Sequence, residues 1–217
     1  MLVCGVDEAG RGPVIGPLAM AGIALGKAAA ESLRSLGVKD SKLLTVEKMR
    51  SLRQPIVAAA SGFHLVLIQP AEIDAAVQSD SSNLNWLEAA HCSAIINRLA
   101  PGRAIVDCPS PNTAAYARYL RSLLDDKSME LVVEHKADFN HIECSAASIL
   151  AKVAREDAIQ EVKEKLGIDF GSGYLTDPKT QQFLKENFES NSDIFRKSWL
   201  PYRQAVAAKF QSRLSDF

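Results

Sequence analysis

Short apolar runs separated by glycine, proline or polar turns divide the chain into alternating elements. Five of these runs are six to eight residues long and rich in aliphatic residues, which predicts strands over 2–7, 18–25, 62–69, 103–108 and 129–135. Apolar residues at helical spacing predict helices over 28–37, 45–60, 83–102, 113–124 and 142–167. Pro101 and Gly102 stop the third helix, and Gly167 ends the last. After the glycine-rich turn at 171–173 the pattern is helical, with no further strand.

The order of these elements predicts the fold class. Strands dominate the start of the chain, strands and helices then alternate, and helices follow to the end. This order favours an α/β fold with a mixed five-stranded sheet flanked by helices, antiparallel at its start and extended by parallel strands. We therefore expect the α/β domain to span residues 1–170 and a helical extension to span residues 171–217.

Composition is that of an ordinary globular protein. Of the 217 residues 47% are hydrophobic and 24% are charged, enough for one large domain with its own core. The start has no basic region followed by an apolar stretch, and charges interrupt every apolar run. We therefore expect a cytoplasmic protein and, as the simplest state, a monomer. The cysteines are widely spaced and are expected to be buried small hydrophobes: Cys4, Cys92, Cys108 and Cys144.

Charge is unevenly distributed. The net charge is −1, which does not indicate a nucleic-acid binder, but residues 178–213 contain seven basic and three acidic residues. This excess predicts an extension that contacts phosphates, with Arg196 and Lys197 as candidates. A solvated helix face is the ordinary alternative.

Acidic residues follow several of the predicted strands. Asp7 and Glu8 close the first strand, Asp107 closes the fourth, and Asp138 comes just after the fifth. In sheets of this class ligands bind beyond the carboxyl ends of the strands, so these acids should share one edge. Singly, each acid could be a turn former, a helix cap or a strand-end residue.

Clustered carboxylates repel one another, and hard divalent cations remove that penalty. The acids therefore predict a site for Mg²⁺ or Mn²⁺, with two ions when substrate is bound, suited to phosphodiester hydrolysis. The glycine loop "GRGPVIG" beside them is a poor dinucleotide fingerprint, because Ile15 occupies the third glycine position and a strand follows. No G-K-[ST] follows the loop, which excludes a standard P-loop.

At these residues the sequence resembles ribonuclease HII, the type 2 ribonuclease H family, closest to its archaeal and eukaryotic branch. The motifs appear in family order over about residues 3 to 200: "GVDEAGRGPVIGPL", "DSKLLT", "NLNWLEA", "IVDCPS", "HKAD", "SAASILAKVARE", "GSGYLTDP" and "FRKSW". The resemblance implies a ribonuclease H-like fold and metal-dependent endonucleolytic cleavage of RNA in RNA–DNA hybrids. Implied tasks are ribonucleotide removal and RNA primer processing.

The resemblance also implies roles for individual residues. The acids Asp7, Glu8, Asp107 and Asp138 match the family's metal-binding set. The segment Gly10, Arg11 and Gly12 matches the backbone loop that reads the 2′-hydroxyl, and Tyr174 matches the tyrosine at the junction between ribose and deoxyribose. Lys42 resembles a basic residue near the substrate backbone.

Further residues and partners are left open by the sequence. His135 and His141 flank Asp138, and either could help a proton or the product leave; solvent-exposed loop histidines without such a role are the ordinary alternative. Ser145 and Ser148 are expected to let the long helix pack closely on the sheet. The ending "FQSRLSDF" has a terminal aromatic that could dock on a partner, although a frayed end is the simpler interpretation. Docking on a sliding clamp is possible, but no sequence feature supports it. A non-catalytic RNA- or hybrid-binding module of the same fold would need the basic extension but not the acids.

Overall fold

Five strands form one mixed sheet in the order β3-β2-β1-β4-β5. The computed structural model describes residues 1–38 and 44–215, so the candidate Lys42 lies outside the described residues. The strands are β1 (Val3–Ala9), β2 (Leu18–Leu25), β3 (Gly62–Ile68), β4 (Arg103–Asp107) and β5 (Glu130–Glu134). β1 pairs antiparallel with β2 and parallel with β4, and β4 pairs parallel with β5. The predicted mixed sheet is confirmed.

The helices are α1 (Lys27–Ser35), α2 (Val46–Ala59), α3 (Pro70–Gln78), α4 (Leu84–Leu99), α5 (Thr113–Leu123), α6 (Ala137–Asn140), α7 (Ile142–Leu166), α8 (Pro178–Asn187) and α9 (Leu200–Ser215). Two of these were not predicted from the pattern, α3 and the short α6. Pro70 directly follows the predicted strand over 62–69 and occupies the first turn of α3, where its fixed φ favours a helix.

The chain forms two compact units that interleave along the sequence. The first contains residues 1–9, 19–67 and 84–155, and the second contains residues 10–18, 68–83 and 156–217. The expected boundary at residue 171 therefore lies inside the second unit. The last change from the first unit to the second falls within α7, between residues 155 and 156.

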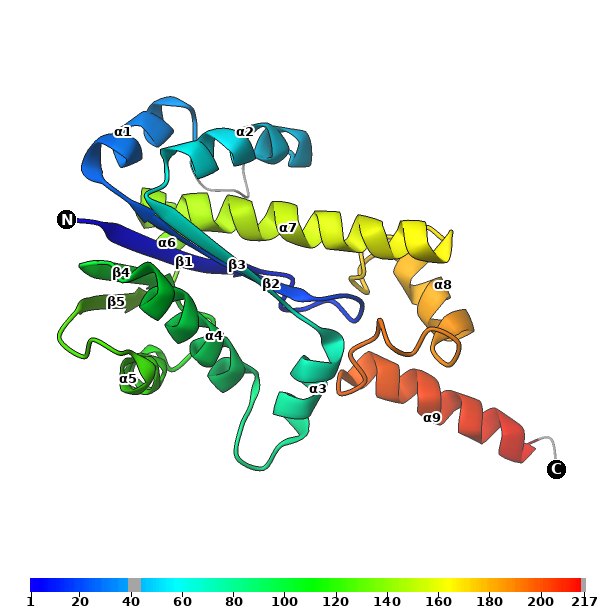
Figure 1. The fold of residues 1–217 in the computed structure, drawn as a ribbon. Helices are drawn as coiled ribbons and strands as arrows, with labels where there is room; N and C mark the ends of the chain where they lie inside the picture. The colour runs from blue at the N-terminus through cyan, green and yellow to red at the C-terminus, as the bar shows by residue number, and fades with distance from the viewer. Residues whose placement is uncertain (39–43, 216–217) are drawn as a thin grey trace. The chain divides into compact units, whose positions relative to one another are not determined.

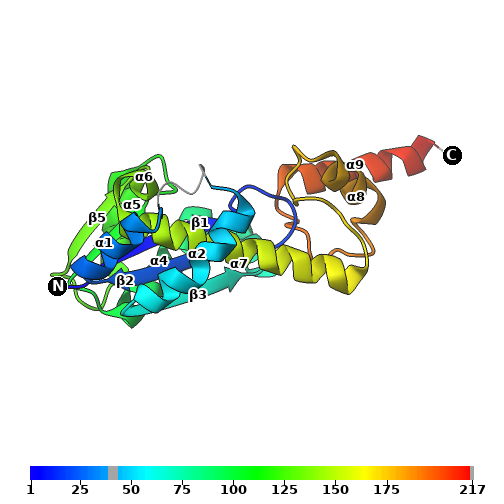
Figure 2. The same ribbon diagram turned by 90° about the horizontal axis from the view of Figure 1, so that it is seen from above.

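In the first unit helices cover both faces of the sheet. α1, α2 and the first part of α7 lie on one face, and α4 and α5 lie on the other (Figure 1). Seen from above, α1 and α2 lie beside α7 (Figure 2). Alternate residues of β2 and apolar residues of α1, α2 and α7 form the core on the first face, among them Ile23, Leu33, Ile56 and Ile149. Among the described residues no helix combines the length and apolar character that crossing a membrane needs.

The second unit has a core of its own, rich in aromatic rings. The ring of Phe183 packs between two others: its centroid lies 5.3 Å from that of Phe170 and 5.9 Å from that of Phe195. Val14 and Ile15, from the glycine loop, are buried in the same core. The loop is therefore anchored in the second unit by its own apolar residues.

Candidate active site

Strand register brings Asp7 and Asp107 side by side. Val6 of β1 lies opposite Val106 of β4 in the parallel ladder, and each aspartate is the next residue of its strand. Because side chains alternate between faces with a period of two, both carboxylates project to the same face of the sheet. The predicted meeting of these two acids at one edge follows directly from this register.

Asp138 joins them from α6, which follows β5. The backbone N–H of Ala137 donates to Oδ1 of Asp107 at 3.0 Å, tying the start of α6 to the end of β4. The hydroxyl of Ser145 donates to the carbonyl oxygen of Asp138 at 2.5 Å, tying α6 to α7. One carboxylate oxygen from each of Asp7, Asp107 and Asp138 lies within 4.8 Å of the others. We call these three residues the acidic cluster.

The acidic cluster is electrostatically costly without a cation. Asp7 and Asp138 are buried, with 5% and 2% of their surface exposed. Burial raises the pKa of Asp7 to about 7; a hydrogen bond with Ser148 lowers it, and the charges of Asp107 and Asp138 raise it again. Carboxylates held this close are the ligands that hard divalent cations prefer. The residues present therefore fit a divalent cation.

Ser148 of α7 is a site residue that the sequence interpretation missed. Its buried side chain bonds to the carboxylate of Asp7, whose Oδ1 also accepts the backbone N–H of Glu8 at 2.7 Å. The helix can reach this far because Gly5 touches it: a Cβ on Gly5 would lie 2.1 Å from the backbone carbon of Glu143. Close packing of α7 was expected, but the hydrogen bond to Asp7 was not, since a serine in an alanine-rich helix carries no sequence signal for it.

Glu8 is separate from the acidic cluster. As the residue after Asp7 in β1, it projects to the opposite face of the sheet, toward α4 and α5. Burial raises the pKa of the Tyr116 phenol on α5, and negative charges that include Glu88 and Glu8 raise it further. The structure thus brings together three of the four predicted acids, and it places the carboxylate of Glu8 within electrostatic reach of Tyr116.

The glycine loop, residues 10–16, is held against the turn that carries Tyr174. Gly10 and Gly16 have φ of 84° and 86°, a region that side chains rarely adopt, which explains the glycines at both ends of the loop. The N–H groups of Val14 and Ile15 donate to the carbonyl of Gly173 at 3.0 and 3.4 Å. A Cβ on Gly12 would meet Cε1 of Tyr174 at 3.8 Å, so the tyrosine ring lies beside the exposed Gly12.

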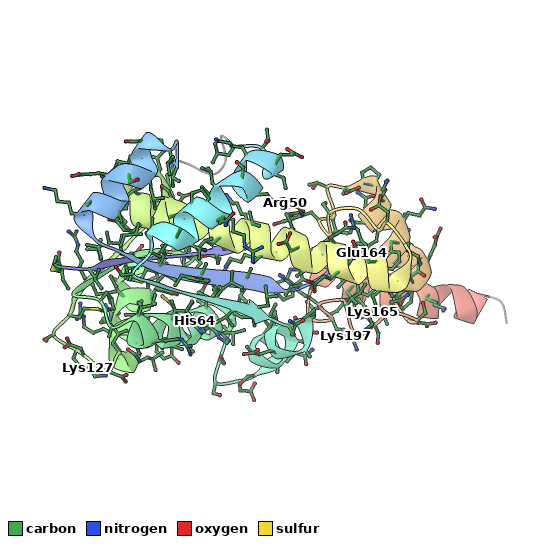
Figure 3. All side chains as sticks on the ribbon, turned by 45° about the horizontal axis from the view of Figure 1, so that its top comes forward. Arg50, His64, Lys127, Glu164, Lys165 and Lys197 are labelled. Carbon is green, nitrogen blue, oxygen red and sulfur yellow. The ribbon has the colours of Figure 1, made fainter. Side chains whose placement is uncertain are left out.

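Arg196 does not take the role expected for it. Its side chain is fully buried, and its guanidinium donates to the carbonyl oxygens of Gly10, Arg11 and Gly16. A group enclosed in this way cannot contact a phosphate, so the expected phosphate contact of Arg196 is wrong. Its neighbour Lys197, labelled in Figure 3, is exposed, as a phosphate contact requires. The number of basic residues in 178–213 could not distinguish a buried basic side chain from an exposed one.

The two histidines near Asp138 have protein partners. Nε2 of His141 lies 3.1 Å from Oε1 of Glu134, and the ring nitrogens of His135 lie 3.1 Å from the Thr113 hydroxyl and from the carbonyl oxygen of Cys108. Both rings therefore brace the connections between β4, β5 and α7. The cysteines Cys4, Cys92, Cys108 and Cys144 are all buried and free, as expected.

Comparisons with known proteins agree with this arrangement. A family model described as "Ribonuclease HII" matches residues 4–201. Ribonuclease HII of Pyrococcus furiosus is 37% identical, with 100% of this chain and 98% of the relative covered. A crystal structure of the ribonuclease H2 from Pyrococcus horikoshii is 37% identical and superposes with a TM-score of 0.84, over 94% of this chain and 97% of that one.

A further solved structure, the complex of PCNA with ribonuclease HII from Archaeoglobus fulgidus, is also 37% identical, with a TM-score of 0.82 over 92% of this chain and 95% of that one. These matches span nearly the full length of both chains, and the expected ribonuclease H-like fold is confirmed. The chain therefore belongs to the ribonuclease HII family, endoribonucleases with ribonuclease H activity on RNA–DNA hybrids.

Proposed function

We propose that this enzyme is a metal-dependent endonuclease that hydrolyses the RNA strand of RNA–DNA hybrids and also cuts 5′ to a single ribonucleotide embedded in duplex DNA. The products carry 5′-phosphate and 3′-hydroxyl ends, as ribonucleotide removal and primer processing require. The observation that carries the proposal is the acidic cluster, three carboxylates from β1, β4 and α6 with oxygens within 4.8 Å of one another.

Asp7, Asp107 and Asp138 would hold Mg²⁺ or Mn²⁺. When bound, such ions would supply the activation of a water and the stabilisation of the leaving oxygen of a phosphodiester. The chain's own part is to hold the ligands in place: Ser148 and the N–H of Glu8 orient Asp7, and the N–H of Ala137 orients Asp107. We also assign Glu8 to this reaction, in keeping with the four acids of the family motif: it lies at the same end of β1 as Asp7, although its side chain projects to the other face of the strand.

Ribose recognition is assigned to the glycine loop and Tyr174. The 2′-hydroxyl is the group that distinguishes RNA from DNA at one nucleotide, and an exposed glycine lets backbone groups approach it. Tyr174 is exposed, with its ring beside Gly12, and offers a flat apolar face to a sugar that lacks the 2′-hydroxyl. The loop would therefore read one ribose and Tyr174 the deoxyribose that follows.

Lys197 remains the candidate for a phosphate contact in the second unit, because its side chain is exposed. Docking on a sliding clamp stays the alternative to a frayed end, and the Archaeoglobus fulgidus relative that was solved with PCNA supports it. Residues 216–217 lie outside the described residues, so no contact of Phe217 enters the proposal.

The function is tested with an RNA–DNA hybrid labelled on the RNA strand. We expect internal cleavage with Mg²⁺ or Mn²⁺ and none in EDTA, with products whose 3′ ends a DNA polymerase can extend. Full cleavage in EDTA would contradict the metal mechanism. Retention of the hybrid on a native gel without cleavage under any metal condition would instead favour a binding module.

Tyr174→Ala should selectively impair cutting at a single ribonucleotide. Losing a stacking surface costs about tenfold where that surface is used. We expect kcat/KM on a duplex with one ribonucleotide to fall about tenfold more than kcat/KM on a long hybrid. Tyr174→Phe keeps the apolar face and should retain the preference. Equal losses of Tyr174→Ala on both substrates would show that the ring does not read the junction.

A further inference from the structure

Backbone carbonyl groups of the glycine loop accept hydrogen bonds from one buried arginine side chain, that of Arg196. The guanidinium of Arg196 donates from Nη2 to the carbonyl of Gly10 at 2.6 Å, from Nη1 to the carbonyl of Arg11 at 2.8 Å and from Nε to the carbonyl of Gly16 at 3.1 Å. The residue is fully buried. A charged side chain in such a place is held there by its partners, and here the partners are backbone oxygens of a single loop.

These bonds determine which way the loop's N–H groups point. In a planar trans peptide the carbonyl of one residue and the N–H of the next point in opposite directions. The carbonyls of Gly10 and Arg11 face the guanidinium, so the N–H groups of Arg11 and Gly12 are directed away from it. Arg196 thereby decides the orientation of two consecutive backbone donors.

We propose that Arg196 is the positioning residue for ribose recognition: it holds the glycine loop so that the N–H groups of Arg11 and Gly12 face the nucleotide. This inference rests on the proposed function of the loop. Arg196 itself is out of reach of a bound nucleotide, because its side chain is fully buried.

Neighbouring residues hold Arg196 in place. Nε1 of Trp199 donates to the carbonyl of Gly12 at 3.3 Å, and the tryptophan ring centroid lies 5.1 Å from the guanidinium carbon. Asp74 of α3 accepts the N–H groups of Lys197 and Ser198, each at 2.8 Å, and the Ser198 hydroxyl at 2.6 Å. Asp74 is buried and was not singled out from the sequence, since its partners lie more than 120 residues away.

Lysine cannot replace this arginine. A guanidinium offers five donors in a planar fork, whereas an ammonium is a point charge on a flexible chain. Arg196→Lys keeps the positive charge but cannot bond the carbonyls of Gly10, Arg11 and Gly16 with one fixed geometry. A milder variant is Trp199→Phe, which removes only the N–H that bonds Gly12 and keeps an aromatic ring over Arg196.

The test measures ribose discrimination, defined as the affinity for a duplex with one ribonucleotide divided by the affinity for the same duplex in DNA alone. Binding is measured with Mg²⁺ in the Asp107→Asn background, which is expected not to cleave. We expect Arg196→Lys to lower the discrimination ratio about tenfold and Trp199→Phe about threefold, with affinity for all-DNA duplex changed less. The matched control, Trp86→Phe on α4, should leave the ratio unchanged.

Wild-type binding without discrimination would overturn the assignment of ribose recognition to the loop, and the positioning role with it. Discrimination by the wild type that persists in both variants would overturn the positioning role alone. If Arg196→Lys does not fold, the ratio for Trp199→Phe decides: a fall supports the inference and an unchanged ratio rejects it. A merely structural role would lower thermal stability and leave the ratio of the folded protein intact.

Discussion

Asp107→Asn is expected to reduce cleavage of an RNA–DNA hybrid by several orders of magnitude while the protein stays folded. The amide removes one negative ligand from the acidic cluster, so the divalent cation loses a charged partner. The fold should survive, because the amide oxygen can still accept the N–H of Ala137 as Oδ1 of Asp107 does at 3.0 Å. Removing a like charge from the cluster should leave stability in EDTA unchanged or higher.

Glu130→Gln provides the matched control. Glu130 begins β5, at the far end of the strand from the Asp107–Glu134 pair, and its carboxylate pairs with Arg103 at 3.2 Å. The same change of acid to amide there should leave kcat within about twofold of the wild type, since surface ion pairs contribute little. Single-turnover rates at saturating metal compare the two variants. Wild-type rates in Asp107→Asn would show that this carboxylate is not part of the reaction.

Without divalent cations the protein should lose stability as the pH rises from about 4 to about 7. The pKa of Asp7 is about 7 in the folded state against 3.8 as its ordinary value. Between these values the folded state binds more protons than the unfolded state, so the free energy of unfolding falls with rising pH and levels off above about 8. The loss should be of the order of a few kcal/mol. Binding of a divalent cation at pH 8 should restore the lost stability.

Urea unfolding at pH 5 and pH 8 in EDTA, repeated at pH 8 with Mg²⁺, measures this linkage. Asp7→Asn removes the titrating group and should flatten the difference, which separates Asp7 from other titrating residues. Ser148→Ala removes a hydrogen bond that lowers the pKa of Asp7. The pKa of Asp7 should therefore rise further in this variant, and its stability should keep falling to a higher pH than that of the wild type. Identical pH dependence in wild type and Asp7→Asn would show that burial of Asp7 carries no such cost.

Sequence patterns by themselves determined the succession of strands and helices along the chain, the mixed character of the sheet and the edge where the acids gather. The reason is that period-two and helical patterns record which face of each element is buried, and the carboxyl ends of parallel strands share one edge. Asp7 and Asp107 could be paired in this way because each directly follows an apolar strand core.

Only the tertiary structure decided which polar side chains serve the site and which serve the fold. Arg196 and Lys197 are adjacent basic residues, yet one is fully buried beneath the glycine loop and the other is exposed. Ser148 reaches Asp7 because Gly5 lets α7 touch β1. Such roles depend on contacts between segments distant in sequence, and a local pattern of residue types carries no record of them.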